Sequence, residues 1–131
     1  MSNSTSAGGI VFNEEGKFIL VRQSDKSWSM PKGRIKDGED TLTAAKREIY
    51  EETGVNKLEF IKDLGSYQRL SSDKVNLRTI ILFLFKTNQK KLSPRDSENP
   101  EAKWAAKEEV VKLLPHKEDK EFFLKAAESL F

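Results

Sequence analysis

Three glutamates lie close together in one short stretch of the sequence, where Glu48, Glu51 and Glu52 are spaced i, i+3 and i+4. On an α-helix this spacing brings all three carboxylates onto one face, within about 100° of one another. Like charges so placed each destabilise a helix by roughly 0.2–0.5 kcal/mol, so a compensating cation is expected. Mg²⁺ usually combines one or two protein carboxylates with water and substrate phosphates. The spacing therefore predicts a Mg²⁺ site, with Mn²⁺ as a substitute, and Arg47 could orient its carboxylates.

The segment from Asp40 to Thr53 is expected to form the helix that carries these glutamates. Asp40 or Thr41 can cap its start, and Gly54 stands where a left-handed C-terminal cap belongs. An apolar stripe beside the acidic one would pack the helix on a sheet and leave the carboxylates at the edge of a cleft; it consists of Leu42, Ala45 and Ile49. Taken alone, a glutamate-rich helix face is more often simply solvated, so the wider segment has to decide between the two interpretations.

The rest of the chain alternates segments typical of strands with segments typical of helices. Four strands are expected, at 7–12, 17–22, 58–64 and 77–85. The last of these is so apolar that it should be central in the sheet. A polar loop over 93–100 precedes Trp104, and two further helices are expected, at about 107–114 and 118–130. This order predicts the α/β (α+β) class, with a mixed sheet and two or three helices.

Bulk composition narrows the class of protein. A length of 131 residues suits one domain, and 37% hydrophobic with 34% charged residues is typical of a soluble globular protein. No apolar run approaches the length of a membrane span, and the polar start lacks a secretory signal, so we expect a cytoplasmic protein with no membrane partner. The net charge of +2 gives no indication of a nucleic-acid partner, and the absence of cysteine excludes disulfides and a cysteine nucleophile. A monomer and a homodimer both remain open.

The segment 33–55 matches a longer pattern around the glutamates at every fixed position: G-x5-E-x7-R-E-U-x-E-E-x-G-U, where U is aliphatic. The matching residues are Gly33, Glu39, Arg47, Glu48, Ile49, Glu51, Glu52, Gly54 and Val55. This pattern is the Nudix box, and the chain is identified by it as a member of the Nudix hydrolase family. The resemblance implies one Nudix domain over 1–131, with the Nudix fold: an α/β/α sandwich around a mixed sheet.

The resemblance also implies roles for the residues of the box. Glu48 and Glu52 would be the principal metal ligands, and Glu51 would be a further ligand or the base that activates water. A backbone carbonyl of Gly33 would also face the metal. Arg47 would orient the carboxylates, and Glu39 would form a structural salt bridge. Outside the box, Glu98 resembles a loop glutamate that lies near the metals in relatives that hydrolyse dinucleoside polyphosphates; a solvated loop acid is the alternative.

The residues just before the box bear on the substrate. The motif Trp28-Ser29-Met30-Pro31-Lys32-Gly33 resembles the W-x-x-P-K-G of diadenosine tetraphosphate hydrolases and diphosphoinositol polyphosphate phosphohydrolases, whereas RNA 5′-pyrophosphohydrolases usually have Gln at the position of Lys32. A chain of four phosphates needs cations beyond the metals. The strands and loops beside the box offer several, chiefly Lys32, Arg34 and Arg78. For an adenine base, Tyr67 and Phe83 are candidate stacking partners, although each is at least as well explained as packing.

Three hypotheses about function follow from these residues. The leading one is asymmetrical hydrolysis of diadenosine tetraphosphate to ATP and AMP. The second is a pyrophosphohydrolase for other nucleoside di- or triphosphates or for inositol pyrophosphates. The third, from a different class, is a Nudix domain that senses a nucleotide without turning it over; the complete set of box glutamates argues against it.

Overall fold

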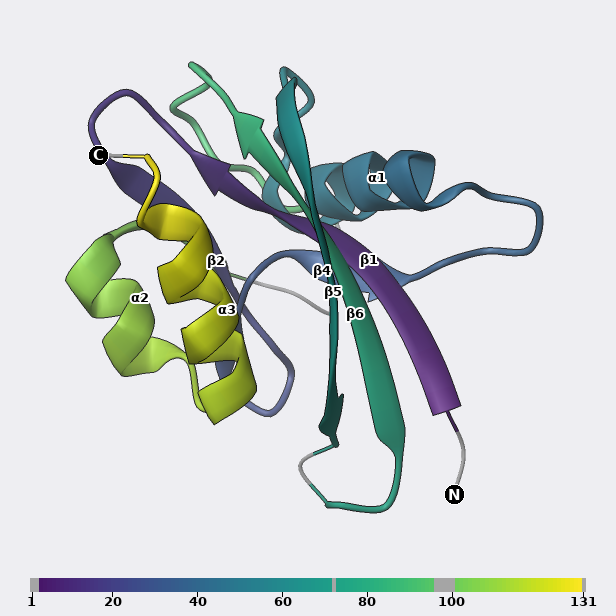
Figure 1. Cartoon of the computed structure of the whole chain (residues 1–131). Coiled ribbons are helices and arrows are strands. Elements are labelled where there is room, and N and C mark those ends of the chain that lie inside the picture. The colour runs from purple at the N-terminus through teal and green to yellow at the C-terminus, as the bar shows by residue number, and fades with distance from the viewer. Residues whose placement is uncertain (1–2, 72, 96–100, 131) are drawn as a thin grey trace.

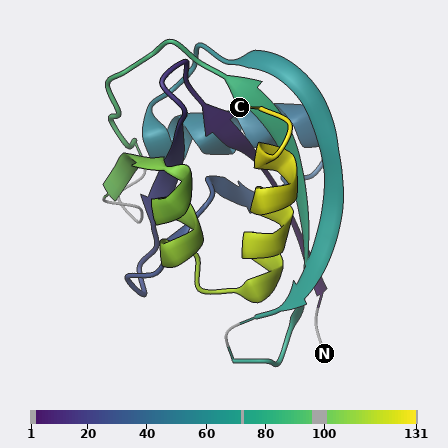
Figure 2. The ribbon, with the colours of Figure 1, turned by 60° about the vertical axis from the view of Figure 1, so that its left-hand side comes forward.

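The sheet of this protein is enclosed between helices on its two faces (Figures 1 and 2). The computed structural model describes residues 3–71, 73–95 and 101–130. Its elements follow in the order β1 (Asn3–Phe12), β2 (Lys17–Arg22), β3 (Trp28–Ser29), β4 (Lys32–Arg34), α1 (Thr41–Thr53), β5 (Glu59–Leu70), β6 (Leu77–Lys86), β7 (Glu101–Ala106), α2 (Lys107–Leu113) and α3 (Lys117–Ala127).

The sheet is mixed, as the sequence predicts. The strand order is β3-β2-β1-β6-β5, with β4 paired to β1 and β7 paired to β2. Only the β1–β6 pair is parallel among the strand pairs of the described residues; the other pairs are antiparallel. The apolar segment that we expected to be central is β6, which lies between β1 and β5 and is mostly buried.

The alternation of side chains along β1 divides the core into two layers. Ile10 and Phe12 belong to the layer under α2 and α3, whereas Ala7 and Val11 belong to the layer under α1. Near the start of the strand, Ser4 and Ser6 continue the first face, but both are polar and half-buried. The layered arrangement confirms the Nudix-type sandwich.

Helix α1 begins and ends as its sequence predicts. The Oδ1 atom of Asp40 accepts a hydrogen bond of 2.7 Å from the backbone N–H of Thr43. At the other end Gly54 adopts a left-handed conformation, with φ of 78°, and its N–H bonds to the carbonyl of Tyr50. Ala44, Ala45 and Ile49 are buried against the sheet. These contacts hold the acidic face of the helix beside β4.

Several elements differ from the sequence prediction. The strand expected at 58–64 runs on to Leu70, because Gly65 has a φ of 86° and the β5–β6 pairing continues past an irregularity there. The short strands β3 and β4 were not predicted, and Trp104 lies within β7. The predicted loop over 93–100 falls partly outside the described residues. No helix in the described ranges is both long and apolar enough to cross a membrane.

Candidate active site

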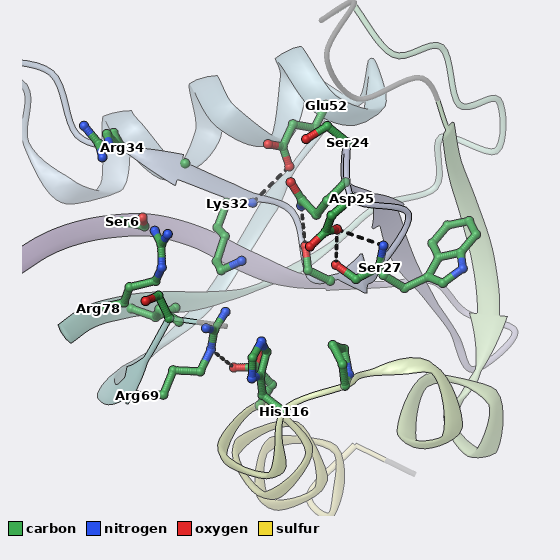
Figure 3. Close-up of a pocket in the computed structure, with 18 of the residues that line it drawn as sticks. Ser6, Ser24, Asp25, Ser27, Lys32, Arg34, Glu52, Arg69, Arg78 and His116 are labelled. Carbon is green, nitrogen blue, oxygen red and sulfur yellow. Dashed lines mark hydrogen bonds and ion pairs between the residues drawn. The ribbon is translucent and has the colours of Figure 1, made fainter. Parts of the chain in front are cut away.

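A pocket of about 700 Å³ opens where β4 passes beside α1 (Figure 3). One wall carries the carboxylates of Glu48, Glu51 and Glu52 from α1. Across the opening lie basic side chains from three strands, β4, β5 and β6, and on another side the connection between α2 and α3. The pocket therefore places acidic groups of α1 and basic groups of three strands around one space.

Arg47 ties the acidic groups of the box together. Its Nε and Nη2 atoms donate to the two carboxylate oxygens of Glu39 at 2.7 and 2.9 Å. Its Nη1 atom donates to Glu48 at 2.7 Å and to Glu51 at 3.2 Å, and Nη2 also donates to the backbone carbonyl of Arg34. This planar two-point pairing fixes the guanidinium between the helix and the loop that precedes it. The predicted salt bridge of Glu39 is present, and Arg47 contacts Glu48 and Glu51, although its orienting role stays a prediction.

The same network changes the acidity of its members. The hydrogen bond from Arg47 is the main reason that the pKa of Glu39 falls from 4.5 to about 2, and the backbone N–H of Lys36 acts in the same direction. The pKa of Arg47 is raised, chiefly by its bonds to Glu39. Both groups are therefore charged throughout the neutral range.

Glu52 and Glu48 are held against β4. Glu52 is buried, with 4% of its surface exposed, and its Oε1 atom accepts a hydrogen bond of 3.1 Å from the backbone N–H of Lys32. The carboxylate of Glu48 lies directly on Gly33: a Cβ atom at that glycine would come within 2.0 Å of Glu48 Oε2. Any larger residue at position 33 would occupy the place of this carboxylate, which explains the glycine.

The oxygen atoms that lie between α1 and β4 suit a hard divalent cation. Two carboxylates one helical turn apart lie beside the backbone of Gly33, and all are oxygen donors. Within the described residues no three acidic or imidazole groups converge closely enough to enclose a cation by themselves. Mg²⁺ does not need such a cage, because water and substrate phosphates usually complete its octahedral shell. The residues present fit a cation that is shared with a phosphorylated substrate.

The basic wall is set by strand pairing. Lys32 and Arg34 on β4 pair with Gly8 and Ser6 of β1, while Arg78 of β6 pairs with Ser4. Paired residues project their side chains from the same face of a sheet, so these cations share one face. Figure 3 shows Lys32 and Arg78 directed into the same space. The structure thus brings together the three cations that the sequence singled out.

Arg69 joins this wall, and the sequence did not indicate it. It pairs with Arg78 across β5 and β6, and its Nε atom donates to Asp119 of α3 at 3.0 Å. Asp119 is 2% exposed and also accepts a hydrogen bond from the hydroxyl of Tyr67, whose ring stacks on Phe122 at 4.6 Å. A buried acid on α3 therefore holds Arg69 at the pocket.

Burial and neighbouring charges act on two further groups of this wall. Burial lowers the pKa of the Lys32 ammonium, and the positive charges of Arg69 and Arg78 act in the same direction. His116, at the start of α3, also lines the pocket; burial lowers its pKa, and Arg69 adds to the effect. Burial is thus the main cause of both shifts, and the guanidinium of Arg69 adds to each.

The aromatic candidates lie elsewhere. Phe83 is 5% exposed and packs in the core layer beneath α1, and Tyr67 is engaged with Asp119; the structure brings neither ring to the pocket. The flat rings among the described lining residues are Trp28 and His116. Trp28 has the ammonium of Lys103 4.6 Å from its ring centroid. Glu98, the candidate loop acid, lies outside the described residues.

Comparison with known proteins shows the family of this chain. Residues 3–126 match the NUDIX domain family. The chain is 40% identical over 68 residues to an RNA pyrophosphohydrolase of Bartonella henselae, a match that covers 44% of this chain and 39% of that protein. It is 30% identical over 125 residues to an RNA pyrophosphohydrolase of Pelagibacter ubique, covering 82% and 78%. Among solved structures, a Caenorhabditis elegans Ap4A hydrolase superposes with a TM-score of 0.80 at 25% identity, covering all of both chains.

The fold, the box and the match over 3–126 define the class together: this chain belongs to the Nudix family. The first curated relatives are matched over only about two fifths of their length. Their activities therefore supply only candidates for this chain. The residues of the pocket have to distinguish between possible substrates.

Proposed function

We propose that this protein is a divalent-metal-dependent pyrophosphohydrolase that cleaves a diphosphate linkage in a nucleoside polyphosphate. The observation that carries the proposal is the arrangement of one pocket, in which the carboxylates of α1 face a wall of lysine and arginine. A diphosphate is inert to water largely because its oxygens repel a nucleophile. This pocket supplies metal ligands on one side and positively charged side chains for the phosphates on the other. Both reduce the negative charge that repels the nucleophile.

The three carboxylates of α1 differ in burial, and we assign their roles accordingly. Glu48 and Glu52 would hold Mg²⁺ or Mn²⁺ beside Gly33, and a bound cation would neutralise phosphate charge and acidify the attacking water. Of the three carboxylates, Glu51 has the most exposed side chain, at 36%, against 12% for Glu48. It is therefore the one most open to a water molecule, and we assign it the role of a further ligand or of the general base, with Glu52 and Glu98 as the alternatives for the base.

Diadenosine tetraphosphate is the substrate that we favour. Water would attack one phosphorus, the adjacent P–O–P bond would break, and the products would be ATP and AMP. Lys32, Arg34 and Arg78 line the same pocket as the carboxylates, and three cations suit a chain of several phosphates. Trp28 and His116 are the rings on which an adenine would stack.

Release of pyrophosphate from the 5′ end of RNA is the second candidate. It is favoured by the names of the curated relatives that this chain resembles. The same pocket would bind a 5′-triphosphate, so the metal site does not distinguish the two substrates. The lysine at position 32 favours the dinucleotide, because RNA 5′-pyrophosphohydrolases usually have glutamine there.

A substrate panel with Mg²⁺ tests both proposals. The panel contains diadenosine tetraphosphate, ATP, ADP-ribose, an inositol pyrophosphate and a 5′-triphosphorylated oligoribonucleotide, with products separated by ion-exchange chromatography. We expect ATP and AMP in equal amounts from the first compound, loss of activity with a chelator, and recovery on adding Mg²⁺. Turnover of mononucleotides or RNA alone would reject the dinucleotide, and binding without turnover of any compound would reject an enzyme in favour of a nucleotide-sensing module.

A further inference from the structure

The face of β1 that packs beneath α2 and α3 becomes polar toward the start of the strand. On β1 the side chains of Ile10 and Phe12 are buried beneath these helices, but Ser4 and Ser6 on the same face are half-buried and line pockets. The change from apolar to small polar residues along one face of one strand marks where the core ends. Beyond that point the sheet face itself forms the floor of a groove.

Two arginines flank this floor. In the register of the sheet, Arg34 of β4 lies opposite Ser6, and Arg78 of β6 lies opposite Ser4. Because paired residues share a face, the two guanidinium groups stand on either side of β1. Figure 3 shows Arg34, Ser6 and Arg78 grouped at one end of the active-site pocket.

A second pocket, of about 430 Å³, lies past these arginines. Arg34 and Arg78 line both pockets, so the two spaces adjoin through this pair. The remaining lining of the second pocket is neutral: it consists of Asn3, Ser4, Thr5, Ile35 and Asn76. Charge is therefore concentrated at the junction, and beyond it only amides, hydroxyls and one aliphatic side chain are found among the lining residues described.

We propose that the second pocket binds the distal nucleoside of a dinucleoside polyphosphate, and that Arg34 and Arg78 bind the phosphates that connect the two nucleosides. The inference rests on the proposed function and extends it to the whole substrate. Charge-assisted bonds from guanidinium groups suit the bridging phosphates. Amide and hydroxyl groups suit the edges of a base and a ribose, and Ile35 offers an apolar face. The volume is within the range of small-ligand pockets.

A substrate pair that differs only in the distal nucleoside tests the proposal. Diadenosine tetraphosphate and adenosine 5′-tetraphosphate share one nucleoside and four phosphates. In the Ser4→Trp variant a large ring would fill the second pocket, and we expect kcat/KM for the dinucleotide relative to the mononucleotide to fall at least tenfold, mainly through KM. Asn76→Trp adds the same ring from the connection that precedes β6 and should act in the same way. Circular dichroism establishes that each variant is folded.

Glu15→Trp is the matched control, because it adds the same ring at an exposed position of the β1–β2 turn, away from both pockets; it should preserve the wild-type ratio. An unchanged ratio in both folded groove variants would overturn the second nucleoside site and leave the proposed function standing. A fall confined to 5′-triphosphorylated RNA would overturn it in favour of an RNA path through the groove. If the wild-type protein cleaves neither tetraphosphate, the second nucleoside site is overturned; if it cleaves no compound of the substrate panel, the proposed function itself fails.

Discussion

Replacing Asp119 by alanine should lower the free energy of unfolding far more than its position on the last helix, α3, suggests. The side chain of Asp119 is 2% exposed and that of its partner Arg69 is 8% exposed, so water screens their interaction little. Removing one member of a buried ion pair leaves the other charge unpaired and typically costs about 3–5 kcal/mol. Tyr67 loses its acceptor at the same time. For a chain of this size we expect the melting temperature to fall by roughly 10–18 °C.

Urea unfolding followed by tryptophan fluorescence, with thermal melts by circular dichroism, measures this loss. Glu121→Ala is the matched control, because Glu121 lies on the same helix and its pair with Lys117 is exposed, at 3.8 Å; its unfolding free energy should change by less than about 0.5 kcal/mol. Tyr67→Phe should fall between the two, near 1 kcal/mol. A loss below about 1 kcal/mol for Asp119→Ala would refute the argument that this acid holds Arg69 and α3 to the pocket.

Three further predictions concern the box and its cations. Since Arg47 holds the pKa of Glu39 at about 2, the stability from this pair is present above pH 4.5 and is lost as the pH falls toward 2; Glu39→Gln should flatten that part of a pH series of thermal melts, and an unchanged acid profile would contradict the pairing. Gly33→Ala should lower kcat at least tenfold with little change in melting temperature, because the new methyl group displaces only the end of the Glu48 side chain; full activity would contradict this placement. Arg78→Ala should raise KM for the tetraphosphate substrate more than it lowers kcat, and steady-state kinetics showing an effect on kcat alone would place Arg78 outside the binding wall.

Local features of the fold could be read from the sequence. The capping residues of α1 act within a few positions of one another, so Asp40 and Gly54 mark its ends correctly. The spacing of the glutamates sets their common face in the same way, and the apolar segment 77–85 identifies the inner strand β6. In each of these cases the residues that carry the signal are close together in the sequence.

Features that depend on pairing between distant segments could not be predicted. Arg69 reaches the pocket because β5 continues past Gly65 and because Asp119, 50 residues later, receives its guanidinium. Phe83 illustrates the same point, since the sequence offers it as an aromatic group while the register with Gly9 turns it beneath α1. A single residue of register decides between the core and the pocket.

The same reasoning explains why the reaction is better defined than the substrate. The proposed metal ligands are local to the box, whereas the cations and polar groups of the two pockets come from β1, β4, β5, β6 and α3. Substrate specificity therefore depends on residues that only the folded sheet brings together.

The kcat of Glu52→Gln tests the central claim, that the carboxylates of α1 carry the hydrolytic chemistry. Glutamine keeps the shape of the side chain and an oxygen to accept the bond from Lys32 N–H. Measured with saturating Mg²⁺ and diadenosine tetraphosphate, its kcat should fall at least tenfold, about 1.4 kcal/mol in the barrier, while Glu59→Gln at an exposed position of β5 keeps the wild-type rate. A folded Glu52→Gln variant with the wild-type kcat would contradict the account.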